Sequence, residues 1–269
     1  MYRRGLTAIA MLVGAMSVAS AVEFRAAAPT AESMVATYGW TGFTVGANAG
    51  YGMSRRQLHV VDADPTYFPA FDGGETMPHR GSSFAGGLSV GYDKQFGSVV
   101  MGAFASLSGL SASDRTWSRN ACCGSADDRF DTKLSALGIV GLRAGYAIDR
   151  TLVYATGGAA FGRMSFDLTD DNKYPNGSVN VGSPTGQKSA TRWLTGYTIG
   201  GGFEYAVLSN VIVGFDYKYV DFGSERWNMS TNSYDGSGNL QGKAKYVIDT
   251  RNNIAQTVGV AVKYKFGGM

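Results

Sequence analysis

Five charged residues lie in segments that otherwise alternate between apolar and small side chains. Each falls in the phase opposite to the apolar one, so all five belong on the same side of their strands. Charges in a confined interior are costly unless they pair or reach trapped water, and lining a narrow ion path is the alternative role. These candidate interior charges are Arg143, Glu204, Asp216, Lys218 and Lys263.

Both histidines of the chain, His59 and His79, fall in the polar segment Arg55–Arg80, which contains three prolines. Clusters of Pro, Gly and charge predict a long loop here. With Tyr67 and several carboxylates nearby, the two histidines could contact a metal ion or haem. The alternative is that both are solvated loop residues.

The only two cysteines, Cys122 and Cys123, are adjacent. Two neighbouring cysteines provide neither a disulfide framework nor the ligand set of a zinc site. In an oxidising compartment they could form a vicinal disulfide that pins a loop, and free or intermolecular thiols are the alternative.

The sequence offers no arrangement typical of a catalytic centre. No histidine falls in a predicted strand, so no His–Ser or His–Asp pair would be held rigidly at a rim. The glycine-rich runs Gly157–Gly162 and Gly200–Gly202 lack the following helix and Lys-Ser/Thr of a phosphate loop. We therefore expect no enzymatic activity, no catalytic residue, no resident metal and no cofactor.

The N-terminus has the three parts of a secretory signal. Arg3 and Arg4 precede an apolar stretch, Leu6–Val18, and Ala19-Ser20-Ala21 fits the small-x-small rule. We predict a signal peptide over residues 1–21, cleaved before Val22, and a periplasmic lead-in over 22–39. Removing the two arginines lowers the formal charge from +3 to +1, which argues against binding to nucleic acid.

Eight alternating segments follow, and the connections between them are alternately long and short. This regularity and the glycine-rich strands predict an all-β protein, an eight-stranded antiparallel up-and-down transmembrane β-barrel over residues 40–269. In the last segment, Val258–Phe266, valines and two aromatics share one face while Lys263 and Lys265 share the other. The expected strands are 42–54, 82–93, 98–110, 132–148, 151–166, 190–207, 211–222 and 257–266, and the long loops are 55–80, 111–131, 167–189 and 223–252.

Several motifs resemble the alphaproteobacterial outer-membrane β-barrel proteins, a group that includes surface immunogenic and hemin-binding proteins. They are Trp40-Thr-Gly-Phe43 with the strand that follows, Gly87-Leu-Ser-Val-Gly-Tyr92, Gly141-Leu-Arg-Ala-Gly-Tyr146 and the ending Val-Gly-Val-x-Val-x-Tyr-x-Phe. The resemblance implies an abundant, surface-exposed barrel in the bacterial outer membrane, surrounded by its lipid and lipopolysaccharide.

The same resemblance implies that Tyr264 and Phe266 form a C-terminal signal read by the outer-membrane assembly machinery, although Gly267, Gly268 and Met269 follow here. We expect a structural, surface-exposed role in the cell envelope. One alternative is a narrow porin-like channel for small solutes or ions, and another is a surface receptor that binds haem or a host ligand through its long loops.

Overall fold

The computed structural model describes residues 38–63, 76–117, 128–170, 186–234 and 240–267. The predicted signal peptide, most of the lead-in and the pair Cys122 and Cys123 lie outside these ranges. No helix in the described ranges is long and apolar enough to cross a membrane. The strands are β1 (Gly42–Ala63), β2 (Thr76–Phe96), β3 (Val99–Trp117), β4 (Asp128–Ile148), β5 (Thr151–Asp170), β6 (Gly186–Ala206), β7 (Val211–Asp221), β8 (Glu225–Tyr234) and β9 (Leu240–Phe266).

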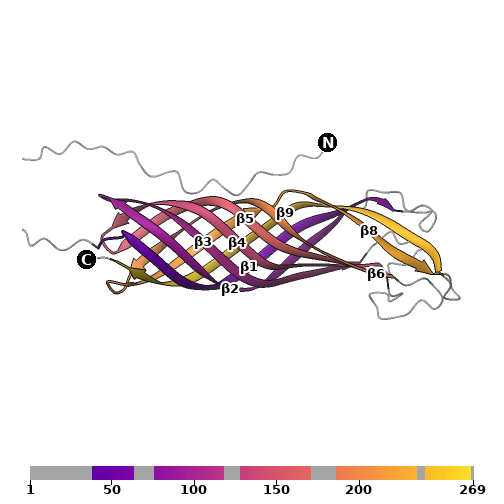
Figure 1. Cartoon of the computed structure of the whole chain (residues 1–269), viewed down its shortest axis with the longest axis horizontal. Helices are drawn as coiled ribbons and strands as arrows, with labels where there is room; N and C mark the ends of the chain where they lie inside the picture. The colour runs from indigo at the N-terminus through magenta and orange to yellow at the C-terminus, as the bar shows by residue number, and fades with distance from the viewer. Residues whose placement is uncertain (1–37, 64–75, 118–127, 171–185, 235–239, 268–269) are drawn as a thin grey trace, which may run out of the picture. The chain divides into compact units, whose positions relative to one another are not determined.

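The strands form one closed antiparallel ring (Figure 1). Each strand from β1 to β6 pairs with the next, β7 pairs with β9, and β9 closes the barrel against β1. β8 continues the line of β7 along β9 after a break at Phe222–Ser224, where Gly223 has a φ of +69° and accepts a hydrogen bond from the Asn253 side chain (3.0 Å). The ring thus has eight strand positions, which confirms the predicted barrel.

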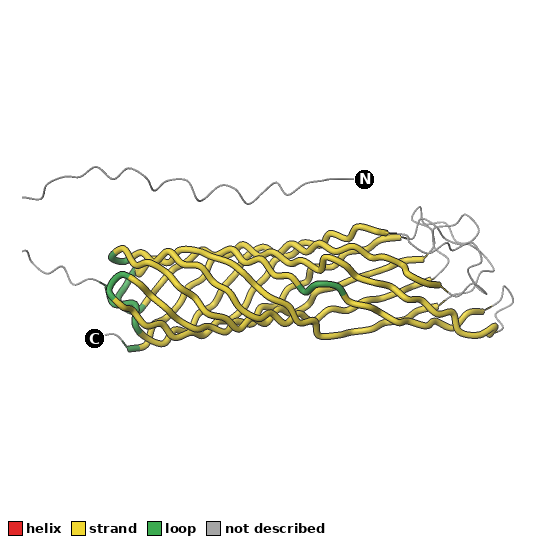
Figure 2. Tube along the Cα trace, turned by 90° about the horizontal axis from the view of Figure 1, so that it is seen from above, coloured by secondary structure: helices red, strands yellow, loops and turns green. Residues whose placement is uncertain are grey.

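The barrel has a definite stagger between its strands. A path of paired residues that starts at Val45 on β1 crosses every strand of the ring and returns to β1 at Arg55, ten residues further along. A stagger of this size tilts the strands strongly to the barrel axis and leaves an interior that side chains can fill. The short turns lie together at one end (Figure 2), which is the periplasmic end in proteins of this architecture.

The strands extend further than their sequence pattern predicts. Arg55–Ala63 and Thr76–Arg80 belong to β1 and β2, so the predicted loop 55–80 is wrong at both ends. β3 likewise runs to Trp117, β4 begins at Asp128, and β5 runs to Asp170. The predicted loop 223–252 is wrong because it contains β8 and the first half of β9.

The cause is an inversion of polarity along each strand. On β1 the outward phase begins with Phe43, Val45 and Tyr51 and continues with Arg55 and Gln57. The inward phase begins with Thr44, Gly46 and Asn48 and continues with Leu58 and Val60, both fully buried. The half that contains the short turns is therefore apolar outside and polar in the middle of its interior, as expected in lipid. The other half is polar outside and apolar inside, as expected in water.

The apolar outer band is long enough to cross a membrane. On β1 it runs from Phe43 to Met53, and these ten residue steps, at about 3.4 Å each and a tilt of ~40°, span about 25 Å. Aromatic side chains gather at its periplasmic edge, as in interfacial girdles: Phe43, Tyr92, Tyr146, Tyr205, Tyr264 and Phe266. The remaining length of each strand extends beyond this band on the side of the long connections.

Candidate functional site

A charged layer crosses the interior of the lipid-spanning half. The Arg143 guanidinium donates from Nε to Asp93 Oδ1 (2.6 Å), from Nη2 to Asp93 Oδ2, and from Nη1 to Glu204 Oε1 (2.8 Å). Lys263 Nζ donates to the same Glu204 oxygen (2.5 Å). Arg143, Asp93 and Glu204 are all buried. Two cations and two carboxylates thus neutralise one another across β2, β4, β6 and β9.

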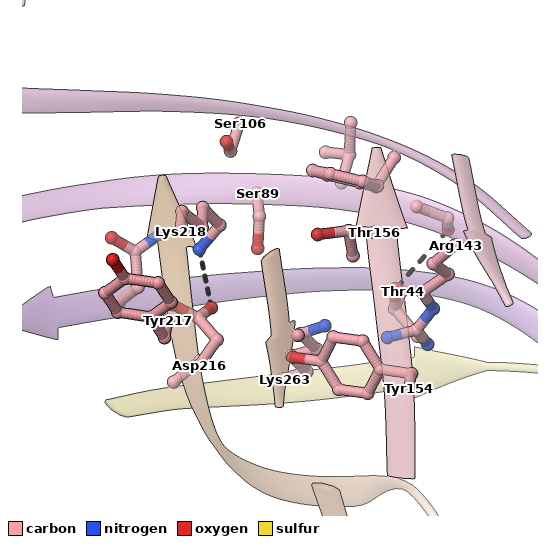
Figure 3. Close-up of a pocket in the computed structure, with 16 residues that line it drawn as sticks. Thr44, Ser89, Ser106, Arg143, Tyr154, Thr156, Asp216, Tyr217, Lys218 and Lys263 are labelled. Atoms are coloured by element: carbon pink, nitrogen blue, oxygen red, sulfur yellow. Dashed lines mark hydrogen bonds and ion pairs between the residues drawn. The ribbon is translucent and has the colours of Figure 1, made fainter. Parts of the chain in front are cut away.

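The Tyr154 ring and the ion pair of Lys218 and Asp216 line the space next to this charged layer. The Arg143 guanidinium lies 5.2 Å from the centre of the Tyr154 ring, a cation–π contact. Lys218 Nζ pairs with Asp216 Oδ2 (2.6 Å), and both side chains face a cavity of about 40 Å³ lined also by Thr44, Ser89, Ser106 and Thr156 (Figure 3). A polar space of this volume holds roughly two or three water molecules.

An apolar layer closes the periplasmic end of the interior. Trp40, just before β1, is 1% exposed, packs edge-on against Tyr38 at 4.9 Å, and donates from its ring nitrogen to the Asp149 carbonyl (3.4 Å). Lys265 donates to the Gly39 carbonyl, and its Nζ lies 4.1 Å from the Tyr38 ring centre. The layer consists of Tyr38, Trp40, Val100, Ala147, Leu152, Ala206 and Ile212.

A second and larger apolar layer fills the extension beyond the lipid band. Every strand contributes to it, and Phe166 stacks on Trp227 with ring centres 5.7 Å apart. Its members include Leu58, Met77, Leu110, Phe130, Leu134, Ile139, Met164, Phe166, Leu194, Val220, Phe222, Trp227, Met229 and Ile248. The interior thus alternates, from the periplasmic end, between an apolar layer, the charged layer with its cavity, and a second apolar layer.

The structure brings the five predicted interior charges together on the inner face of the barrel. Arg143, Glu204 and Lys263 form one network, and Asp216 and Lys218 form a separate pair beside the cavity. Sequence reasoning did not assign roles to Tyr38, Trp40, Tyr154 and Lys265. The signals that could have found them are the placement of Tyr38 and Trp40 just before β1 and the inward phase of Tyr154 and Lys265.

The two histidines do not form a common site. His59 lies on β1 and contacts the Thr76 hydroxyl (3.1 Å), whereas His79 lies on β2 and is 1% exposed. His59 falls in the outward phase and His79 in the inward phase, so the barrel wall separates them. The placement of both residues in a loop is therefore wrong, because they are strand residues of the extension. No cluster of three or more His, Cys, Asp or Glu side chains that could hold a metal ion occurs in the described ranges.

Comparison with known proteins adds sequence relatives. The family model for the outer membrane protein beta-barrel domain matches residues 7–266. The 31 kDa outer-membrane immunogenic protein of Brucella melitensis is 30% identical over 261 residues, 96% of each chain. The 22 kDa outer membrane protein of Rhizobium leguminosarum is 28% identical over 151 residues, which cover 56% of this chain and 58% of the relative.

Solved structures similar to this chain include two outer-membrane proteins. OprG from Pseudomonas aeruginosa aligns over 86% of this chain and 100% of its own, with 10% identity and a TM-score of 0.44. Neisserial surface protein A aligns over 84% of this chain and 98% of its own, with 16% identity and a TM-score of 0.38.

Proposed function

Because the chain belongs to the outer membrane protein beta-barrel domain family, we propose that it is a sealed barrel that displays its outer strands and loops at the cell surface. Its resemblance to alphaproteobacterial relatives and its location in the bacterial outer membrane are both confirmed by these matches. What remains to be assigned is what such a barrel does there.

The observation that carries the proposal is the layered interior. A continuous ion path would have to cross the periplasmic layer around Trp40 and the outer layer around Phe166 and Trp227, and both are apolar and buried. An ion entering either layer would exchange most of its hydration for contacts with largely apolar side chains, which is strongly unfavourable. Between them, the charges of the central layer are already paired. This arrangement supports a structural barrel over the porin-like alternative.

Planar-bilayer recording of the refolded chain tests the proposal. We expect no discrete current steps under conditions in which a general porin conducts in the same bilayers. The pair Lys218→Gln and Asp216→Asn would report on a path through the cavity, because both side chains line it. Steady steps from the native barrel whose size changes in these two variants would refute the sealed barrel and establish the channel.

The surface role has its own support. The Brucella melitensis relative is described as an immunogenic outer-membrane protein. This chain is exposed at the cell surface in the same way if its long connections face away from the periplasm. Arg115 and Arg226, on the outer face of the extension, suit a cysteine-labelling test on intact cells. In a background in which Cys122 and Cys123 are replaced by serine, a membrane-impermeant maleimide should label Arg115→Cys and Arg226→Cys but not Ser98→Cys in the periplasmic turn. The reverse pattern would invert the proposed orientation.

A further inference from the structure

Four cationic side chains point outward just beyond the apolar band. Arg55 lies on β1, Arg80 on β2, Lys133 on β4 and Arg163 on β5, and all four are exposed. Along the barrel axis, away from the short turns, each cation lies just beyond the last outward apolar side chains of the band, such as Met53, Phe84 and Phe161. They therefore lie where the hydrocarbon ends and the headgroups of the outer leaflet begin.

The stagger of the barrel brings the four side chains to nearly one level. Arg55 and Arg80 are direct register partners. Lys133 pairs with Ser165, two residues from Arg163 on the same outward phase of β5, so these two cations are diagonal neighbours. A path of paired residues around the eight strand positions returns to β1 ten residues further along, so the level rises steadily from strand to strand. When this rise is included, all four cations fall within about two residues of one another along the barrel axis. We call these four residues the cationic arc.

Among the residues that the structure describes, the four members of the cationic arc have no carboxylate partner. No ion pair joins any of its four members to a carboxylate within the described ranges. The Asp114 carboxylate accepts a hydrogen bond from the backbone amide of Arg80. Like charges placed directly opposite across two strands, as in Arg55 and Arg80, destabilise a sheet unless an anion lies between them.

The rest of the circumference is different at this level. β6 presents Trp193 and β7 presents Asp221, while β9 presents Ile254 and then Arg251, which lies 4.0 Å from the Asp249 carboxylate. Asp221 accepts hydrogen bonds from the Tyr197 hydroxyl (3.4 Å) and the Gly223 amide (2.7 Å). The cations without a carboxylate partner thus cover one side of the barrel, which fits one bound molecule better than a uniform attraction to the membrane surface.

We propose that the cationic arc binds the phosphate groups of one lipopolysaccharide molecule, whose acyl chains pack on the apolar band below. Arg55 and Arg80 would hold one phosphate, and Lys133 and Arg163 a second. The two pairs are separated by β3, so that Arg80 and Lys133 lie two strand spacings apart, about 10 Å. Guanidinium groups suit this role because they donate two parallel hydrogen bonds to a phosphate. A glycolipid with two phosphate groups matches this pattern of two separate cationic pairs.

Native mass spectrometry of the detergent-solubilised full chain tests this assignment, with bisphosphorylated lipid A as the probe. We expect one retained lipid A, and at least about tenfold weaker binding by the variant Arg55→Gln/Arg80→Gln/Lys133→Gln/Arg163→Gln. The matched control replaces four outward arginines of the extension that already lie within ion-pair distance of Asp131 or Asp249, and should bind as the native chain does. The control positions are Arg115, Arg129, Arg226 and Arg251.

Three results would overturn the proposal. Equal affinity of the native chain and the arc variant would remove the arc from the site. Equal binding of lipid A from which both phosphates have been removed would assign the contact to the apolar band alone. Equal competition by phosphatidylglycerol or inorganic phosphate would show a general phosphate site. If the fourfold variant does not fold, judged by heat-modifiable gel migration, the two double variants replace it, and unchanged binding by both would be equally decisive.

Discussion

Replacing Arg143 with methionine is the sharpest test of the charged layer. Arg143 is 7% exposed and neutralises Asp93, which is 2% exposed, through both carboxylate oxygens. The variant Arg143→Met keeps most of the side-chain length but removes the charge. Glu204 retains Lys263 at 2.5 Å, whereas Asp93 is left as a buried carboxylate without the cation that it contacts in the native barrel.

The size of the effect follows from this geometry. Breaking a buried ion pair by removing one partner typically destabilises a protein by about 3–5 kcal/mol, because an uncompensated charge remains. Removing both members of the pair, in Arg143→Met/Asp93→Leu, should recover about 2 kcal/mol of that loss. The control Lys218→Met breaks a pair whose side chains are 18% and 20% exposed to the cavity, and should cost no more than about 1 kcal/mol.

Equilibrium urea unfolding from phospholipid vesicles, followed by tryptophan fluorescence, measures the five free energies of the native chain, Arg143→Met, Asp93→Leu, the double variant and Lys218→Met. Unfolding and refolding curves must coincide for the comparison to hold. Two results would refute the reasoning. One is a loss below about 1 kcal/mol for Arg143→Met, and the other is a double variant whose loss equals the sum of the losses of Arg143→Met and Asp93→Leu. Either would mean that water in the adjacent cavity, rather than Arg143, compensates Asp93.

Three further predictions concern other parts of the barrel. Gly102→Ala should lower stability by about 1–3 kcal/mol in the same urea assay, because its Cβ would meet the Asp93 carboxylate, whereas Gly109→Ala on the same strand meets nothing closer than 3.9 Å and should be near neutral. Trp40→Ala should cost about 3–5 kcal/mol by opening the periplasmic layer, and an unchanged urea midpoint would contradict that role. Burial lowers the pKa of His79 below its usual 6.5, so the unfolded chain binds the proton more tightly. Stability should be full above pH 6.5 and fall below it by up to about 1.4 kcal/mol per unit until the folded pKa is reached. A pH dependence as steep in His79→Gln as in the native chain would exclude this assignment.

The lipid-spanning half could be predicted from the sequence because lipid imposes a simple rule. Outward positions must be apolar and inward ones must not be, so a period of two with one apolar face identifies each strand. The rule ends where the lipid ends. Beyond Ser54 the outward phase of β1 becomes Arg55, Gln57 and His59, and a search for outward apolar residues reads this as a loop. The inverted alternation that Leu58 and Val60 make with these residues was the available signal.

The sequence predicts which residues face the interior of the barrel, but not which of them contact one another. Period-two alternation places Arg143, Glu204 and Lys263 on the inner face, yet their pairing depends on the stagger between strands, which decides which inward residues share a level. That stagger is a property of the closed ring and leaves no local trace in the sequence. The cationic arc was missed for the same reason, since its members come from four strands and meet only through the register.

The two halves of the barrel also differ in what stabilises them, and this bears on how the loops are presented. In the lipid-spanning half, apolar side chains on the outer face contact lipid. In the extension, apolar side chains pack against one another in the interior, as in a water-soluble protein. On β1 the extension runs from Met53 to Ala63, about 25 Å at the same rise and tilt. A core containing Phe166, Trp227 and Ile248 fills this part from within. The described outer ends of these strands therefore lie well beyond the phosphates that we assign to the cationic arc.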